Sequence, residues 1–472
     1  MSFVDLRFPA LAFLALLLYW QGRTPRHKNL VLIGMSLVIY GWIHPWMALL
    51  LLWSALLDYG TAIWIEDRPE QRRLALGVSL VGNLGTLAAF KYLDWFLGSV
   101  STWLGGQGLA PAAPLLGWVL PLGISFYTFQ TLGYTLDVYH RRLRAERSLV
   151  HYLAFVLFFP QLVAGPIERG GHLLPQLKAE RRWATNAIAS GLSLALWGAV
   201  LKVVVADTLA PYVDVIYSIP EPAGLLVWAG TLAFGVQLYA DFQGYTSLAR
   251  GLALMFGVDL VRNFDEPFLA KTTPEFWRRW HISMSSWLRD HMMVPLLGSA
   301  YPVPALRLAG AVMLTFVAIG VWHGAGWHYA VFGLWHGAWS LFFVWATPRF
   351  PWTVPRPIAA LLHGALVLAP GGFLFRERDV GRALDFMTSS PLQGTADDAV
   401  VVTVLLALSA VLGALPLGVW WLRRSVPQWS RVGTESEPSS WLILHTTWWA
   451  IAIVGLFVFH RVTVRDFVYF AF

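Results

Sequence analysis

The stretch that decides the fold is AVVVTVLLALSAVLGALPLGVWWL, residues 399–422, which contains no charged side chain. As a helix it matches the roughly 17–25 residues that cross a bilayer core of about 30 Å. The whole chain has the same character, because 57% of its residues are hydrophobic, 13% are charged and the mean hydropathy is +0.57. Soluble domains are about one quarter charged. The sequence therefore predicts an all-α, polytopic transmembrane bundle.

Similar apolar runs recur along the chain, and the pattern predicts about 11 to 13 membrane helices in one membrane-embedded unit over residues 1–472. The expected helices cover residues 3–20, 28–44, 46–65, 74–98, 115–137, 150–165, 186–206, 223–240, 305–322, 326–347, 357–375, 399–422 and 441–460. No internal repeat of the inverted-repeat transporter kind is visible in the sequence.

The placement of the charged residues indicates whether the chain is more suited to bind nucleic acid or lipid. The net charge is +7, yet most Arg and Lys stand in short connectors between apolar runs. That placement is typical of cytoplasmic loops in a multi-pass protein, so lipid headgroups rather than nucleic acid are the expected partners. The chain has no cysteine, which excludes a disulfide framework, a thiolate zinc site and a thioester formed on the protein itself.

The segment from residue 241 to 300 is too rich in Trp, Arg, His and Asp to face lipid directly. Within it, an apolar stripe at helical spacing consists of Phe276, Trp280, Met284 and Trp287. Arg278 and Arg279 fall on other faces of the same expected helix, which we predict to lie at the membrane interface or to re-enter from it over residues 272–295.

Histidines in apolar segments are the main candidates for chemistry, because a titratable side chain inside a membrane is costly. His323 is followed by Gly324 and Gly326, whose lack of side chains lets an extended ligand approach the imidazole. His281 lies in RRWHIS. The alternative for both is a packed histidine satisfied by a neighbouring carbonyl, and that reading is favoured for three others: His291, His328 and His336.

No metal site is predicted. The chain has no H-E-x-x-H motif, and His323 and His328 are five residues apart, about 140° around a helix. Asp241 is a further polar candidate, since DFQGY follows an apolar run. Its carboxylate is expected to orient a histidine or to pair with Arg278 or Arg279, with interhelical hydrogen bonding as the alternative.

Six ordered blocks carry a resemblance to a known family. They are PLGISFYTFQTLGYTLDVY (121–139), FFPQLVAGPIER (158–169), DFQGYTSLARGLALMFG (241–257), NFDEPFLAKTTPEFWRRWHISMSSWLRD (263–290), GVWHGAGWHYAVFGLWHG (320–337) and FRERDVGRALDFM (375–387). These blocks, densest over 121–340, resemble the membrane-bound O-acyltransferases, in the branch that contains the alginate O-acetylation and teichoic acid D-alanylation membrane proteins. In RDHMMVPLLGS the chain departs from relatives, so His291 takes no role from the resemblance.

The resemblance implies a helical bundle with a central funnel or tunnel, in which His323 is the catalytic residue and His281 the second family histidine. It implies an acyl thioester donor, acetyl-CoA in the first instance, with no permanently bound cofactor. Arg278, Arg279, Asp241, Trp280, Gly324 and Gly326 are then candidate donor or substrate contacts.

The implied location is the bacterial inner membrane. The implied partners are a polysaccharide acceptor such as alginate and an extracytoplasmic esterase-like acetyltransferase. A polysaccharide or lipid transporter, or a non-catalytic scaffold of a glycan synthase, are the alternative functions.

Overall fold

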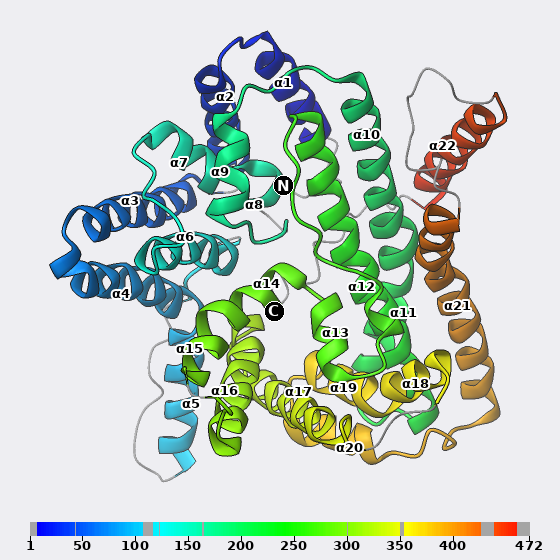
Figure 1. The fold of residues 1–472 in the computed structure, drawn as a ribbon. Helices are drawn as coiled ribbons and strands as arrows, with labels where there is room; N and C mark the ends of the chain where they lie inside the picture. The colour runs from blue at the N-terminus through cyan, green and yellow to red at the C-terminus, as the bar shows by residue number, and fades with distance from the viewer. Residues whose placement is uncertain are drawn as a thin grey trace.

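A computed structural model of the chain describes residues 7–42, 44–106, 117–121, 123–162, 165–299, 301–349, 354–425 and 439–459. These residues form helices and no strands, arranged as one bundle (Figure 1). Among them, seven helical stretches are long and apolar enough to cross a bilayer: Pro45–Asp67, Pro69–Lys91, Thr185–Ser218, Gly224–Met255, Ala305–His323, Arg356–Arg376 and Ala396–Val419. The predicted all-α polytopic architecture is confirmed.

The helices follow the expected apolar runs closely. In the first half of the chain they are α1 (Arg7–Gln21), α2 (Pro25–Gly41), α3 (Pro45–Asp67), η1 (Pro69–Gln71), α4 (Arg72–Lys91), α5 (Leu93–Gly106), α6 (Ile124–Tyr139), α7 (Leu149–Val156), α8 (Phe159–Leu162), α9 (Gly170–Lys178), α10 (Thr185–Val200), η2 (Leu201–Ala206) and α11 (Asp207–Ser218). The second half comprises α12 (Gly224–Met255), η3 (Pro267–Leu269), α13 (Thr273–Arg279), α14 (Ile282–Leu288), η4 (Arg289–Met293), α15 (Val294–Leu297), α16 (Ala305–His323), α17 (Trp327–Ala346), α18 (Arg356–His363), η5 (Gly364–Leu368), α19 (Ala369–Arg376), α20 (Val380–Thr388), α21 (Ala396–Ser425) and α22 (Ser439–Phe459).

Two expected spans are interrupted, which is one reason why the 11 to 13 predicted spans exceed the seven full-length stretches of the described residues. The run over 74–98 divides at Tyr92 into α4 and α5, and the run over 150–165 divides into the short helices α7 and α8. In the other direction, the helix expected over 223–240 continues to Met255. Asp241 consequently lies inside α12 rather than after its end.

The segment 272–295 does not form the single helix that the stripe predicted. Thr272 caps α13 by accepting a hydrogen bond from the backbone N–H of Glu275, α13 ends at Arg279, and α14 begins at Ile282. Between them His281 takes a left-handed conformation with φ of 43°, which no α-helix contains. The predicted continuous stripe was wrong, because the chain turns at this point. Helices of seven residues are also too short to span a bilayer.

α16 and α17 form a tightly packed hairpin near α19 (Figure 1). Their backbones meet at two glycines. A Cβ atom on Gly320 would lie 1.9 Å from the carbonyl oxygen of Tyr329, and one on Gly333 would lie 2.3 Å from that of Phe316. Any side chain there would push the helices apart, so these glycines hold the end of α16 against α17.

Candidate active site

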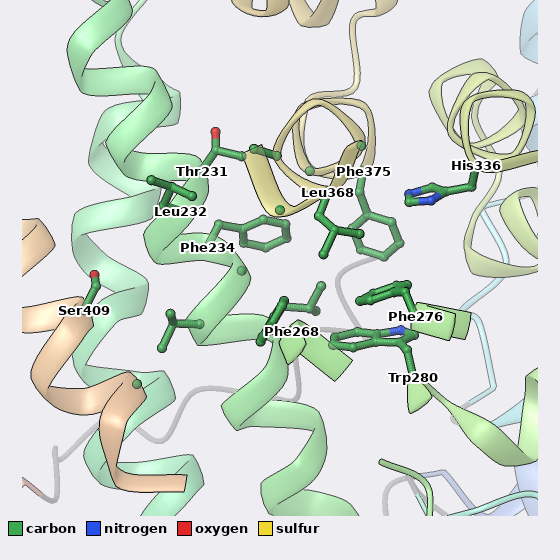
Figure 2. Close-up of a pocket in the computed structure, with 18 of the residues that line it drawn as sticks. Thr231, Leu232, Phe234, Phe268, Phe276, Trp280, His336, Leu368, Phe375 and Ser409 are labelled. Atoms are coloured by element: carbon green, nitrogen blue, oxygen red, sulfur yellow. The ribbon is translucent and has the colours of Figure 1, made fainter. Parts of the chain in front are cut away.

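A cavity of about 540 Å³ lies between α12, α13, α17, α19 and α21, and the end of α16 reaches its wall (Figure 2). Its volume falls within the range of small-molecule sites, roughly 300–1,000 Å³. The wall is mostly aromatic, aliphatic and glycine. Its aromatic and histidine lining residues are Phe234, Phe268, Phe276, Trp277, Trp280, His323, Phe332, His336 and Phe375.

His323, the last residue of α16, reaches this wall with only 3% of its surface exposed. Its imidazole is surrounded by aromatic rings, with ring centroids 5.0 Å from Phe375, 5.1 Å from Trp322 and 6.0 Å from Phe332. The cavity wall therefore presents an imidazole within an otherwise apolar surrounding, as the sequence led us to expect for His323.

Gly324 and Gly326, which the sequence placed beside an approach to His323, are not among the residues that line this cavity. A Cβ atom on Gly324 would lie 2.1 Å from the ring of Tyr329, and one on Gly326 would lie 2.4 Å from the ring of His328. The space beside both glycines is therefore filled by side chains of the next helix. Their small size serves the turn between α16 and α17.

His281 is fully buried, and its neighbours determine which nitrogen carries the proton when the imidazole is neutral. The Oδ1 atom of Asn263 accepts hydrogen bonds from the backbone N–H of Ser283 at 3.1 Å and from its hydroxyl at 2.9 Å. Because this atom is the carbonyl oxygen, the Nδ1 atom of His281, 3.1 Å away, must donate to it. In the neutral imidazole, Nε2 then carries the lone pair. That nitrogen has no hydrogen-bond partner among the described residues.

The two candidate histidines are joined by an aromatic side chain rather than by direct contact. The indole of Trp322 lies 5.5 Å from the His281 ring and 5.1 Å from the His323 ring, between centroids. His281 also packs edge-to-face on Phe242 at 4.7 Å. His281 is not part of the cavity wall, and neither is Trp322, which separates it from His323.

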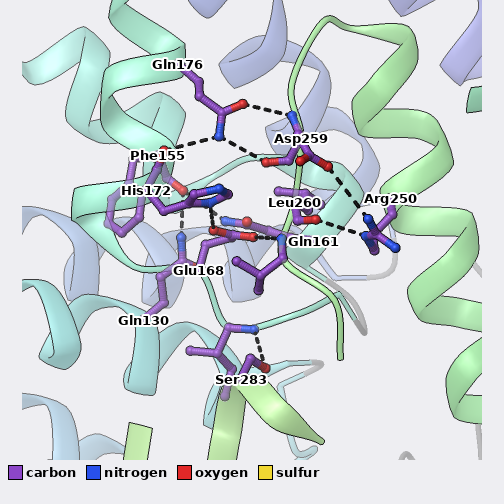
Figure 3. Close-up of polar contacts among 12 residues, drawn as sticks. Gln130, Phe155, Gln161, Glu168, His172, Gln176, Arg250, Asp259, Leu260 and Ser283 are labelled. Atoms are coloured by element: carbon purple, nitrogen blue, oxygen red, sulfur yellow. Dashed lines mark hydrogen bonds and ion pairs between the residues drawn. The ribbon is translucent and has the colours of Figure 1, made fainter. Parts of the chain in front are cut away.

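The loop that carries Asn263 is held by polar side chains from the 158–178 region (Figure 3). A carboxylate oxygen of Glu168 accepts from the backbone N–H of Val261 at 2.6 Å. Gln176 bonds both backbone groups of Asp259, at 2.8 and 3.0 Å. Sequence reasoning singled out neither Glu168 nor Asn263, although Asn263 opens one of the quoted blocks.

Glu168 has a second partner, His172 on α9. The Nδ1 atom of His172 donates to the Oε2 atom of Glu168 at 2.8 Å. This hydrogen bond to a carboxylate raises the pKa of His172 above its ordinary value. Because Glu168 also bonds Val261 in the loop that carries Asn263, we expect the stability of this loop to depend on pH.

Two of the remaining candidates do not face the cavity. Asp241 is completely buried and pairs with Lys202 at 2.7 Å. The expectation that it pairs with an arginine or orients a histidine was therefore wrong. Arg279 bonds Glu275 at 3.0 Å and so serves α13 itself. Asp241 pairs with Lys202 because it lies in the middle of α12 and faces the neighbouring η2, which contains Lys202.

The structure places the other candidates as follows. Arg278 is exposed and is not among the cavity-lining residues, whereas Trp280 lines the cavity, as does His336, for which packing was favoured. His291 contacts the guanidinium of Arg169. Within the residues that the structure describes, no group of three His, Asp or Glu side chains is arranged to hold a metal ion.

Comparison with known proteins identifies relatives. A model of the membrane-bound O-acyltransferase family matches residues 118–350. The probable alginate O-acetylase of Pseudomonas aeruginosa is 37% identical over 328 residues, 68% of this chain and 62% of that protein. The peptidoglycan O-acetyltransferase of Helicobacter pylori is 33% identical over 381 residues, covering 72% and 69%.

A more distant relative is the teichoic acid D-alanyltransferase of Bacillus subtilis, 27% identical over 223 residues, 45% of this chain and 55% of that protein. The chain spans a little under two thirds of the alginate relatives, 62% and 63% for those of Pseudomonas aeruginosa and Azotobacter vinelandii. The resemblance drawn from the six sequence blocks is confirmed.

Proposed function

Because the chain belongs to the membrane-bound O-acyltransferase family, we propose that it transfers an acyl group from a thioester donor to a hydroxyl group at the cavity beside His323. The observation that carries the proposal is the position of His323 on the wall of an aromatic cavity large enough for a small-molecule substrate. That arrangement suits a base that must meet both a hydroxyl and an acyl carbonyl.

In this mechanism the imidazole of His323 accepts the proton of the acceptor hydroxyl. The hydroxyl oxygen attacks the thioester carbonyl, the carbon–sulfur bond breaks, and the leaving thiolate takes up the proton from the imidazolium. Neutral imidazole is the form that begins the cycle, because only this form can accept the proton of the hydroxyl. His281 assists from behind Trp322 by positioning the reacting groups.

The names of the relatives support a proposal for the substrates and setting. Those named above are a probable alginate O-acetylase, a peptidoglycan O-acetyltransferase and a teichoic acid D-alanyltransferase. We infer an acetyl donor such as acetyl-CoA on the cytoplasmic side of the bacterial inner membrane. The acceptor is an extracytoplasmic polysaccharide such as alginate, reached directly or through an esterase-like partner. A passage from both membrane faces to His323 belongs to this proposal.

The test compares His323→Ala, His281→Ala and His336→Ala in purified protein, with thioester consumption and acylated product both measured. A general base contributes about 10²- to 10⁴-fold in rate, so His323→Ala is expected to lose at least that much while its thermal stability stays close to wild type. His281→Ala is expected to lose less. Wild-type turnover by His323→Ala, together with a folded but inactive His336→Ala, would assign the base to His336 instead. No thioester consumption by the wild-type protein would favour a transporter or scaffold.

A further inference from the structure

The last turn of α16, which ends in His323, is held by two consecutive residues from a distant part of the chain. The hydroxyl of Tyr92 donates to the carbonyl oxygen of Val321 at 2.8 Å. The ammonium of Lys91 donates to the carbonyl oxygens of Trp322 at 2.7 Å and His323 at 3.1 Å. Three successive carbonyls at the end of one helix are thus bound by the end of another.

These carbonyls are the ones that a helix leaves without internal partners, because the last four C=O groups have no N–H to meet. They also carry the negative end of the helix dipole, which a cation stabilises. Gly324 continues from His323 in an extended conformation, so the chain itself does not cap the helix. Lys91 and Tyr92 supply that cap from outside.

The ammonium of Lys91 stabilises these carbonyls without a counter-ion of its own among the described residues. Lys91 forms no salt bridge with a carboxylate of the described residues. It also donates to the hydroxyl of Ser125 on α6 at 3.4 Å, and its ammonium lies 5.9 Å from the ring centroid of Tyr92 and 6.0 Å from that of Trp322. A half-buried charge without a counter-ion costs free energy that a neutral donor would avoid. Through these hydrogen bonds, Lys91 links α4 and α6 to Trp322 and His323, the last two residues of α16.

We propose that Lys91 and Tyr92 are positioning residues that fix the C-terminus of α16, so that the imidazole of His323 keeps its place at the cavity wall and the indole of Trp322 keeps its place beside that imidazole. This inference rests on the proposed function, because it takes His323 as the base. Both residues lie outside the segment 118–350 that matches the family model.

The test measures kcat, the KM for the thioester and thermal unfolding for Lys91→Met, Lys91→Arg and Tyr92→Phe. The chain provides matched controls. Tyr19 donates its buried hydroxyl to the carbonyl oxygen of Phe256 at 2.6 Å, and buried Lys28 donates to that of Arg181, both away from the cavity. Tyr19→Phe and Lys28→Met therefore remove the same kinds of bond elsewhere in the bundle.

A small misplacement of a catalytic group costs about 10²-fold in rate, so we expect Lys91→Met to lower kcat by about 10- to 100-fold with KM changed less than about twofold. Lys91→Arg is expected to recover most of the loss, because a guanidinium can still donate to both carbonyls. Tyr92→Phe is expected to lower kcat by a smaller factor. If Lys91→Met fails to fold, Tyr92→Phe is the variant that tests the inference. The controls should keep wild-type kcat.

The inference is overturned if Lys91→Met and Tyr92→Phe keep the kcat of their controls while His323→Ala is inactive. It is also overturned if all four variants lose kcat in proportion to their loss of stability, because the cap would then serve only folding. An active His323→Ala would refute the proposed base and this inference together, so the two failures are distinguishable.

Discussion

Asn263 is the residue that connects the fold to the chemistry of His281, and replacing it with alanine tests that connection. Its Oδ1 atom accepts three hydrogen bonds, one from His281 and two from Ser283. Asn263→Ala removes the one acceptor atom of these three hydrogen bonds from a buried site. At about 1 kcal/mol for each lost bond, the free energy of unfolding should fall by about 3 kcal/mol.

Activity should fall for a separate reason. Without the acceptor, the proton of the His281 imidazole is no longer confined to Nδ1, and the left-handed turn at this residue loses a restraint. Loss of a group that orients a functional histidine typically costs about 10- to 100-fold. We therefore expect Asn263→Ala to reduce acyl transfer by about that factor, measured as acylated product formed by protein that remains folded at the assay temperature.

Ser283→Ala is the matched control. It removes the hydroxyl bond to Asn263 and the bond that the same hydroxyl accepts from Ile167, at 3.0 Å, but it keeps the bond between His281 and Asn263. It should lose about 1–2 kcal/mol of stability with activity close to wild type. If Ser283→Ala and Asn263→Ala lose activity to the same extent, or if Asn263→Ala keeps full activity, the orientation of His281 by Asn263 has no catalytic consequence.

Three further predictions concern stability. Asp241→Ala should destabilise the protein by about 3 kcal/mol, as loss of one partner of a buried ion pair does. Lys202 would then keep only its other carboxylate partner, Asp207. Denaturant titration of the variant against wild type checks this. Gly333→Ala should cost about 1–3 kcal/mol through its clash with a carbonyl of α16, and an unchanged unfolding midpoint would contradict the close helix contact. Because Glu168 raises the pKa of His172, the stabilisation by this pair is complete below about pH 6.5 and is lost as pH rises through the folded-state pKa. The stability difference between wild type and His172→Ala should thus shrink with rising pH, and a difference that grows would refute the assignment.

The helical architecture was predictable because the hydrophobic runs are long, and those of α16, α17 and α21 begin and end within a few residues of the expected positions. The catalytic role of His323 rests on a different ground, since the blocks around it resemble a known family, and it stays a prediction. The structure places His323 on the cavity wall, whereas spacing alone left packing open.

The features that sequence reasoning missed depend on contacts between distant segments. The turn at His281 is fixed by Asn263, so local helical periodicity favoured a continuous helix instead. The cap on α16 joins Lys91 to His323 across 232 positions, and no periodic pattern reports such a pair. Asp241 was assigned to the wrong cation because its partner, Lys202, lies in a π-helical turn of another helix.

The aromatic wall beside His323 offers little to hold an ordered water molecule. Apart from indole N–H groups, its side-chain polar atoms in the described part of the chain come from Thr231, Ser409, His323 and His336, and the Thr231 hydroxyl already donates to the carbonyl of Val227 at 2.7 Å. A retained water needs two to four polar partners. In the proposed acyl transfer, so few polar groups on the wall would favour an acceptor hydroxyl that is held in place over hydrolysis of the thioester. Such a wall would conserve activated acyl groups.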